Sequence, residues 1–519
     1  MKHARVLLHP DFAVAPIDRR IFGSFVEHLG RAVYTGIYEP GHPTADDDGF
    51  RADVLDLARE LGVTLVRYPG GNFVSGYVWE DGVGPRDRRR PALDLAWRTI
   101  DPNTVGTDEF LAWAERAGVE PMMAVNLGTR GAAEAAALVE YCNAPVGSRW
   151  ADLRAANGRV EPYGVRVWCL GNEMDGPWQI GHTTAEEYGR LAAQAGQAMR
   201  LVDPSIELVA CGSSAMDMPT FGAWERTVLA QAFDVVDHIS MHAYYEELDG
   251  DRASFLASGT AMDRFIERVV ASADAVSAER GSDRRITISF DEWNVWYRVS
   301  RFAGAESLPV QGGADGPPRL LEDVHSGLDA VVVGDLLVTL LNHADRVRIA
   351  CLAQLVNVIA PIMTEPGGPA WRQPTFHPVA ATARLAAGTA LDLRVTCPTT
   401  TTAQHGEVPV VTAAATWDEG ADGHDAGSGP LALFCVNRSA EPVEVRVDHP
   451  GLAVTLEGGT RVVADREPTV AGPAHAARVA RECVSDLPAP GDAGAVVGQT
   501  TVTLAPESWT VFRGRAARV

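Results

Sequence analysis

The chain is 519 residues long, enough for two or three domains or for one large barrel with an appended domain. Its 68 acidic and 45 basic residues give a net charge of −23, which argues against nucleic acid and anionic membranes as partners. The seven cysteines are dispersed without a CxxC pair, which is typical of free buried thiols in a reducing compartment. Because the sequence contains neither a secretory leader nor an apolar run of transmembrane length, we expect a cytoplasmic protein.

Eight short apolar runs, each bounded by Gly, Pro, Asn or charged residues, predict eight buried strands. Helical patterns separate them, such as residues 50–61, which end at Gly62. Apolar strands that alternate with helices predict a parallel sheet covered on both faces, and eight such units favour an α/β fold of the (β/α)8 barrel type. The expected barrel strands are 22–27, 63–68, 121–126, 165–170, 207–211, 236–241, 285–290 and 347–352.

The pattern changes after about residue 380. Short strand-like segments separated by turn residues predict an antiparallel β-sandwich in the C-terminal part. The apolar run 4–8 precedes the first barrel strand and is expected to pair with this sandwich. We therefore expect an N-terminal strand segment over residues 1–17, a catalytic barrel over 18–380 and the sandwich over 381–519.

Polar residues follow nearly every predicted barrel strand. In a (β/α)8 barrel these strand ends meet at one face, where active sites form. The long loops 70–106 and 293–320 are expected to build the walls of that site. The residues expected at this face are Glu27, Asn72, Asn126, Asn172 with Glu173, Ser213, His242 with Tyr244, Glu292 and Gln354.

Glu173 is the first of two glutamates whose position favours chemistry over stability. It follows an apolar run as part of Gly171-Asn172-Glu173. In a glycoside hydrolase, such an asparagine can bind a sugar 2-hydroxyl while the glutamate protonates the leaving oxygen. The alternative is a solvated loop glutamate, which the neighbouring apolar run and Trp178 disfavour.

Glu292 is the second, in Asp291-Glu292-Trp293-Asn294. A nucleophilic carboxylate must be ionised and needs hydrogen-bond donors, for which Tyr244 is a candidate. The alternative is a structural ion pair with an arginine, which is favoured for Asp291 but not for Glu292. Two carboxyl groups about 5–5.5 Å apart would give retaining glycoside hydrolysis, and a separation near 9 Å would indicate inversion.

Three further features surround these glutamates. Glu27 is expected to bind sugar hydroxyls, with the alternative that it orients Arg67 or an asparagine. Arg67 is expected to be structural and to pair with a buried carboxylate. Gly70 and Gly71 would let the backbone approach the ligand closely, and Asn72 offers both a donor and an acceptor.

His242 and the tryptophans complete the candidate site. A hydrogen-bonding role for His242 is favoured over a metal-binding role, because no partners lie at ligand spacing in the sequence. Trp79, Trp97, Trp178 and Trp296 fall in predicted loops, so some of them are expected to stack on sugar rings; the competing interpretation is core packing.

Six sequence motifs occur in an order that is specific as a set: FGSFVEHLGRAVYTGIYEP, RYPGGNF, LDLAWRTIDPNTVGTDEF, WCLGNEMDGPWQIGH, SMHAYY and SFDEWNVWY, followed by the run 350–357. Over residues 15–380 the chain resembles the glycoside hydrolase family 51 α-L-arabinofuranosidases. The resemblance implies a (β/α)8 barrel with a β-sandwich and an intracellular homo-oligomer, a hexamer or smaller. It also implies retaining hydrolysis of terminal arabinofuranosyl groups without a metal or cofactor.

By motif match, the resemblance gives Glu173 the role of acid/base and Glu292 that of nucleophile. The matched positions that hold the furanose are Glu27, Asn72, Asn172, Tyr244 and Gln354, to which the residue chemistry adds Trp97, Trp178 and His242. The expected substrate is an arabinofuranosyl-containing oligosaccharide. The alternatives are a related galactofuranosidase, β-xylosidase or endoglucanase and, less favoured, a non-catalytic sugar-binding barrel.

Overall fold

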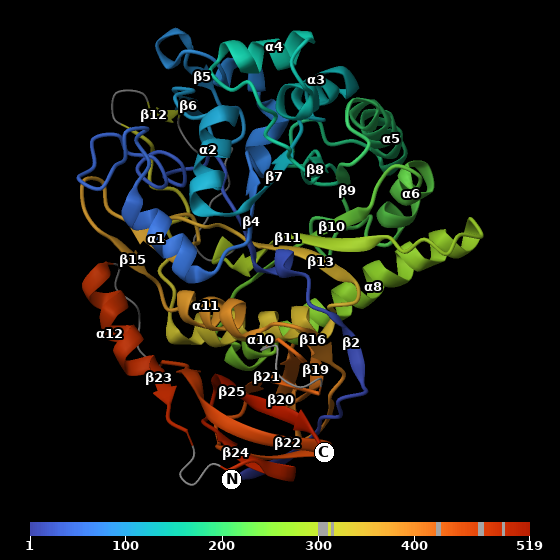
Figure 1. Ribbon diagram of the computed structural model, residues 1–519, viewed down its shortest axis with the longest axis vertical. Coiled ribbons are helices and arrows are strands. Elements are labelled where there is room, and N and C mark those ends of the chain that lie inside the picture. The colour runs from blue at the N-terminus through green and yellow to red at the C-terminus, as the bar shows by residue number, and fades with distance from the viewer. Residues whose placement is uncertain (299–309, 313–315, 422–426, 466–471, 490–493) are drawn as a thin grey trace.

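The computed structural model shows a helix-covered barrel joined to a β-rich domain (Figure 1). It describes residues 1–298, 310–312, 316–421, 427–465, 472–489 and 494–519. In the view of Figure 1 the barrel forms the upper part, and both chain ends lie at the β-rich domain below it. Among the described residues, no helix combines the length and the apolar character that crossing a membrane requires.

Eight parallel strands close into a barrel in the order β10-β11-β13-β3-β4-β7-β8-β9. Each predicted barrel strand corresponds to one of them, so the predicted (β/α)8 fold is confirmed. The strands are β3 (Gly23–Phe25), β4 (Leu65–Tyr68), β7 (Glu120–Ala124), β8 (Val167–Leu170), β9 (Glu207–Ala210), β10 (His238–Tyr245), β11 (Thr287–Val295) and β13 (Val347–Leu352).

Strands β10 and β11 are longer than the sequence pattern indicates. They remain paired as far as Tyr245 and Val295, beyond the predicted ends at residues 241 and 290. Tyr244 and Glu292 therefore lie within strands and not in the loops that follow them, which fixes their backbones by ladder hydrogen bonds.

The helices cover the barrel for reasons visible in the sequence. In α1 the stripe Val54, Leu57, Ala58 and Leu61 is buried, and Gly62 ends the helix with a φ of 80°, a left-handed conformation that glycine adopts without strain. The helices are α1 (Ala52–Leu61), α2 (Thr107–Ala117), α3 (Ala132–Asn143), α4 (Arg149–Ala156), α5 (Ala185–Val202), α6 (Ala223–Ala232), α7 (Arg252–Leu256), α8 (Ser258–Glu279), α10 (Gly327–Asn342), α11 (Phe376–Leu385) and α12 (Pro473–Cys483).

Helix α10 joins the two domains. It is apolar on all sides because it packs against barrel elements and also against the sheet of the β-rich domain. Asp335 of this helix forms a buried ion pair of 2.7 Å with Arg438 of that domain. All seven cysteines are free, and six of them are buried.

A ten-stranded, mostly antiparallel sheet forms the β-rich domain. Both N-terminal strands belong to it, because β1 pairs with β17 and β22, and β2 pairs with β16. The division of the chain at residues 17 and 380 stays a prediction. The strands of this sheet are β1 (Lys2–Leu7), β2 (Ala13–Pro16), β16 (Thr389–Leu391), β17 (Arg394–Thr396), β20 (Val411–Trp417), β21 (Ser428–Asn437), β22 (Val443–Val463), β23 (Val484–Leu487), β24 (Val496–Leu504) and β25 (Ser508–Arg518).

Small sheets and short 3₁₀ helices complete the fold. Three of these helices lie in the loop after β4, which also carries the β5–β6 hairpin. The remaining strands are β5 (Ala92–Leu93), β6 (Thr99–Asp101), β12 (Gln311–Gly312), β14 (Ile362–Thr364), β15 (Ala370–Arg372), β18 (Thr399–Thr402) and β19 (Gly406–Pro409). The 3₁₀ helices are η1 (Arg19–Phe22), η2 (Asn72–Gly76), η3 (Trp79–Gly82) and η4 (Arg86–Arg88).

Candidate active site

A cavity of ≈ 840 Å³ lies at the carboxyl ends of the barrel strands. Its apolar wall includes Leu95, Ile180 and Trp296, which come from three different loops or strand ends. This combination of converging polar groups and apolar walls is typical of ligand sites. The sequence-predicted residues that line it are Glu27, Asn72, Trp97, Glu173, Trp178, Tyr244, Glu292 and Gln354.

Glu173 and Glu292 face each other in this cavity. One carboxylate oxygen of each lies within 4.8 Å of the other, and both glutamates line the cavity although their exposed fractions are only 9% and 5%. Inverting glycosidases need about 6.5–9.5 Å to fit a water molecule beside the sugar, whereas retaining enzymes hold the two groups at about 5–5.5 Å. Two carboxylate oxygens that approach each other within 4.8 Å fit the shorter of these two separations.

Local backbone features aim these side chains into the barrel. Gly171 and Glu173 both have positive φ angles, 91° and 43°, so the chain turns sharply directly after β8. The pairing of β11 with β13 is interrupted between Phe290 and Trp293. Such a bulge changes the alternation of side chains, which allows Asp291 and Glu292 to contact the same guanidinium although they are adjacent in the strand.

Arg67 of β4 is that guanidinium, and it is completely buried. Its Nη1 donates to Glu292 Oε1 at 2.8 Å, its Nη2 donates to Asn172 Oδ1 at 2.6 Å, and its Nε lies 3.7 Å from Asp291 Oδ2. The expected structural pairing of Arg67 with a buried carboxylate is thus present. The sequence favours an ion pair with an arginine for Asp291 but not for Glu292. In the structure Arg67 contacts both, and Glu292 nevertheless lines the cavity.

Tyr244 is the second donor to Glu292. Its hydroxyl donates to Oε2 at 2.8 Å, as the sequence predicts, so two donors hold the two oxygens of Glu292. Asn172 lies behind Glu292 and Tyr244. Its Oδ1 accepts from Arg67, and its Nδ2 donates to Gln179 Oε1 at 3.3 Å. Both carboxylate oxygens of Glu292 are therefore hydrogen-bonded, one to a cation and one to a phenol.

His242 lies behind the two glutamates and is almost completely buried. Its Nδ1 is 2.8 Å from Glu173 Oε1 and 3.6 Å from Glu292 Oε2, while its Nε2 is 3.1 Å from Asp291 Oδ1. Burial alone would lower the pKa of His242, but the negative charges of Glu292, Asp291 and Glu173 outweigh it and raise that pKa well above its usual range. Both ring nitrogens of His242 thus face carboxylates, and its role as a substrate-binding residue stays a prediction.

Trp178 contacts the other oxygen of Glu173. Its indole Nε1 donates to Oε2 at 2.6 Å, and its ring remains 46% exposed at the cavity. The two oxygens of Glu173 therefore have different neighbours. Oε1 meets His242 behind the site, and Oε2 meets Trp178 on the side of the cavity.

Glu27 forms the opposite wall with Trp97 and Gln354. Its Oε1 accepts from the backbone N–H of Phe73 at 2.9 Å and from Trp97 Nε1 at 2.7 Å, and its Oε2 accepts from Gln354 Nε2 at 3.1 Å. Burial raises the pKa of Glu27 to about 8 against these donors, and the charge of Glu292 adds to the rise. Glu27 contacts neither Arg67 nor an asparagine through any of these bonds.

The glycines after β4 serve a different contact from the one the sequence indicates. A side chain at Gly71 would place a Cβ 2.6 Å from Glu27 Oε2, and one at Gly70 would collide with the ring of Phe25 at 1.9 Å. The close approach that requires glycine is therefore to Glu27 and Phe25, the wall of the cavity.

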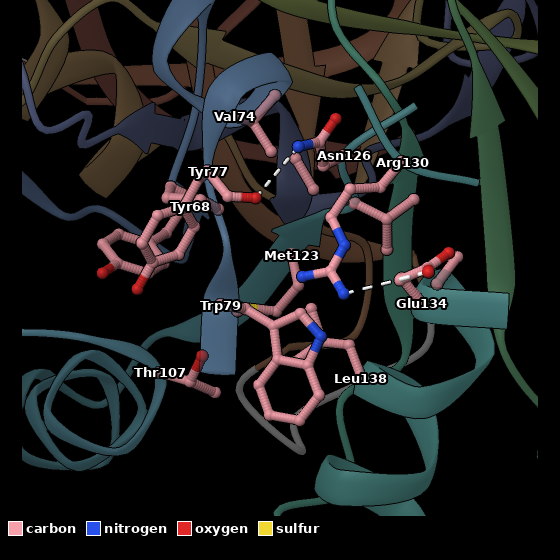
Figure 2. Close-up of a pocket in the computed structure, with 14 residues that line it drawn as sticks. Tyr68, Val74, Tyr77, Trp79, Thr107, Met123, Asn126, Arg130, Glu134 and Leu138 are labelled. Atoms are coloured by element: carbon pink, nitrogen blue, oxygen red, sulfur yellow. Dashed lines mark hydrogen bonds and ion pairs between the residues drawn. The ribbon is translucent and has the colours of Figure 1, made fainter. Parts of the chain in front are cut away.

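Some predicted residues lie elsewhere. Asn126 turns away from the cavity and donates to the backbone oxygen of Tyr77 at 2.9 Å. Trp79 is buried against Tyr141 and Trp150, with ring centroids 5.2 and 5.1 Å away, so core packing is correct for this tryptophan. Figure 2 shows both beside a separate cavity of ≈ 20 Å³, which is large enough for about one water molecule.

Sequence reasoning missed the apolar part of the site. Leu95, Pro177 and Ile180 line the cavity, but a single apolar residue in a loop carries no sequence signal. Ser214 also lines it and holds Asp175 through its backbone N–H at 3.0 Å; only its position next to the predicted Ser213 could have indicated it.

Glu173, His242 and Glu292 bring three potential ligand atoms within 4.8 Å of one another. These atoms already have partners within the protein: His242 Nδ1 contacts Glu173, and Glu292 accepts from Arg67 and Tyr244. The arrangement therefore fits a hydrogen-bonded carboxylate pair. The prediction of a site without metal or cofactor stays a prediction.

A closed (β/α)8 barrel with two facing carboxyl groups at the ends of its strands is an arrangement that retaining glycoside hydrolases use. Two family models match the chain: the α-L-arabinofuranosidase 1 domain over residues 57–258 and the α-L-arabinofuranosidase C-terminal domain over residues 291–491. The chain belongs to the family 51 α-L-arabinofuranosidases.

Individual relatives agree with this assignment. An intracellular exo-α-(1→5)-L-arabinofuranosidase of Streptomyces lividans is 53% identical over 99% of this chain and 75% of its own length. An exo-α-(1→6)-L-arabinofuranosidase of Bifidobacterium longum is 55% identical over 85% of this chain and 84% of its own. The solved structure of a family 51 α-L-arabinofuranosidase from Bifidobacterium longum is 45% identical and superposes with a TM-score of 0.90 over 99% of this chain and 100% of its own.

Proposed function

We propose that this protein is a retaining, exo-acting α-L-arabinofuranosidase that releases terminal arabinofuranose from arabinose-containing oligo- or polysaccharides. The observation that carries the proposal is the pair Glu173 and Glu292, whose carboxylate oxygens lie within 4.8 Å of each other in one cavity. Membership of the family supports the sugar, and the geometry supports the stereochemistry.

The reaction is a double displacement. Glu292, held ionised by Arg67 and Tyr244, attacks the anomeric carbon, while Glu173 donates its proton to the departing oxygen. Glu173 then removes a proton from water, which attacks the same carbon, and the carboxylate of Glu292 leaves. Two inversions give net retention.

The furanose binds between the catalytic pair and the opposite wall. Asn72, Gln354 and Glu27 supply polar groups there, and Trp97 is fixed by its bond to Glu27. Behind the pair, Asn172 and His242 support the glutamates. Trp178 lies on the side where the leaving group departs, because it contacts the proton-donating glutamate.

The linkage that is cleaved is decided by the apolar outer part of the cavity. Relatives above 50% identity are named for (1→5) and for (1→6) linkages, so this similarity does not select one linkage. We propose short arabinofuranosyl oligosaccharides as substrates, a cytoplasmic location as in the relative named intracellular, and a homo-oligomer that is a hexamer or smaller.

Hydrolysis of an aryl α-L-arabinofuranoside, followed by NMR, tests the proposal. The α-anomer of arabinose is expected as the first product, and Glu292→Gln should reduce turnover by at least about 10³-fold. Aryl galactofuranoside, β-xyloside and β-glucoside serve as comparisons. The β-anomer as first product, or full turnover by Glu292→Gln, would contradict the proposal; faster hydrolysis of a comparison sugar would overturn its substrate.

A further inference from the structure

His242 bridges the acidic groups of the active site. Among the described residues, it is the one side chain whose ring nitrogens lie close to Glu173, Glu292 and Asp291, at 2.8, 3.6 and 3.1 Å. All four side chains are buried, and so is Arg67, which contacts the two acidic residues of β11. Buried charges of this kind are stable only when they balance.

The charges before the reaction balance only if His242 is protonated. Glu173 must be neutral to act as an acid, whereas Glu292 must be ionised to act as a nucleophile. Asp291 is ionised as well, because the charges of Arg67 and His242 lower its pKa although burial alone would raise it. These two negative charges face one arginine, so an imidazolium is needed to make the cluster neutral.

The charges balance again in the glycosyl-enzyme. Esterification removes the charge of Glu292, and proton transfer leaves a new negative charge on Glu173. Arg67 and a protonated His242 still face two carboxylates, now Glu173 and Asp291. The negative charge has moved between two groups that lie on the same side of the imidazole, at its Nδ1.

We propose that His242 is a permanent imidazolium, held in that state by Asp291. It is the fixed counter-ion for the negative charge, which moves from Glu292 to Glu173 in the first half of the reaction and returns in the second. His242 is then a positioning residue. Its Nδ1–H donates to Glu173 Oε1. The proton that is transferred is therefore carried by the other oxygen, Oε2, which lies beside Trp178.

Two other titratable groups face the imidazole. Asp175, on the loop after β8, accepts hydrogen bonds from Ser214, and burial raises its pKa to about 6, so above that pH it adds a negative charge that stabilises the imidazolium further. Tyr244, from the same strand as His242, remains neutral, since burial and the charge of Glu292 raise its pKa far above its usual range. The inference rests on the proposed roles of Glu173 and Glu292 and adds the charge state that both roles require.

Nitrogen-15 NMR of the histidine-labelled protein tests the charge state directly. The signals of His242 are assigned by their loss in His242→Asn. We expect the doubly protonated ring pattern from about pH 5 to about pH 8, both in the free protein and after trapping with a slow 2-fluoro arabinofuranosyl donor. A neutral ring near pH 7 in either state would overturn the proposal.

Asp291→Asn tests the role of the partner. Without the Asp291 charge, His242 becomes neutral, and Glu173 becomes a weaker acid because a positive charge 2.8 Å away is lost. The basic limb of the kcat/KM profile should move to higher pH by about one unit or more, and poor leaving groups should suffer more than activated ones. Asp175→Asn, which removes another buried carboxylate nearby, is the matched control and should shift the limb less.

The outcomes separate the two proposals. Asp291 would be merely structural, and this inference overturned, by either of two results: an unshifted pH profile with equal losses for all leaving groups, or an equal shift in Asp175→Asn. Hydrolysis with retention by the unmodified protein would still support the proposed function. If Asp291→Asn does not fold, the NMR measurement on the unmodified protein decides.

Discussion

Trp178→Phe isolates one hydrogen bond of the proposed acid/base residue. The substitution keeps an aromatic ring at the cavity, although a smaller one, and removes the Nε1–H that donates to Glu173 Oε2 at 2.6 Å. When Glu173 gives up its proton, that N–H stabilises the new carboxylate. The bond therefore strengthens in the transition state of the first step and should accelerate that step.

The size of the effect follows from the exposure of the bond. A hydrogen bond to a charged group contributes about 1.5–3 kcal/mol. Because Trp178 is 46% exposed and water competes for this bond, we expect its contribution at or just below the lower end of that range. About 1.4 kcal/mol corresponds to a tenfold change. We expect kcat/KM for an alkyl arabinofuranoside to fall about tenfold, and for a dinitrophenyl arabinofuranoside, whose leaving group needs no proton, to change less than about threefold.

Steady-state kinetics with a series of leaving groups provide the assay. Trp178→Ala serves as the comparison, because it also removes the aromatic surface and should raise KM for oligosaccharides as well. Equal losses of kcat/KM across the leaving groups in Trp178→Phe would refute the reasoning, since they would show that the indole N–H does not act on the proton of Glu173.

Three further predictions concern pH, metal and stability. Burial raises the pKa of Glu27 from its ordinary 4.5 to about 8 in the folded protein, so the folded state keeps a proton that the unfolded state loses between these values. The free energy of unfolding should therefore fall by about 1.4 kcal/mol per pH unit as pH rises through this window. Glu27→Gln should make the melting temperature less dependent on pH between about pH 5 and about pH 8, and parallel curves of melting temperature against pH for the two proteins would contradict this. Exhaustive dialysis against EDTA should leave kcat unchanged, whereas a loss restored by one divalent cation would show that a metal is required. Arg438→Met should lower the free energy of unfolding by about 3–5 kcal/mol, because it leaves Asp335 buried without its partner, and should leave KM unchanged; an unchanged urea midpoint would refute this.

The barrel could be predicted because its strands are buried on both faces. Such strands appear in the sequence as short, continuous apolar runs, and each of the eight runs forms one strand. The polar residue after a run marks the catalytic end of the barrel, which is how Glu173, Tyr244 and Gln354 could be placed at one cavity. Boundaries were less accurate, because pairing between β10 and β11 continues beyond the apolar pattern.

The contacts between these residues could not be predicted. Strand alternation places Asp291 and Glu292 on opposite faces, and only the bulge in β11 brings both to Arg67. A bulge leaves no composition signal here. Likewise, Trp79 and Trp97 both lie in the loop after β4, and their different fates depend on tertiary contacts: one packs on Tyr141, and the other donates to Glu27.

Arg67 shows how barrel closure and chemistry depend on each other. Its Nη1 donates to Glu292 on β11 and its Nη2 to Asn172 after β8, while its Nε lies 3.7 Å from Asp291 without a hydrogen bond, so one side chain from β4 contacts residues from two other strands across the interior. A lysine presents one compact charge and could not reproduce the two donations from the fixed fork of the guanidinium. The contact between Arg67 and Glu292 therefore exists only when the barrel is closed, because β4 is not a neighbour of β11 in the barrel.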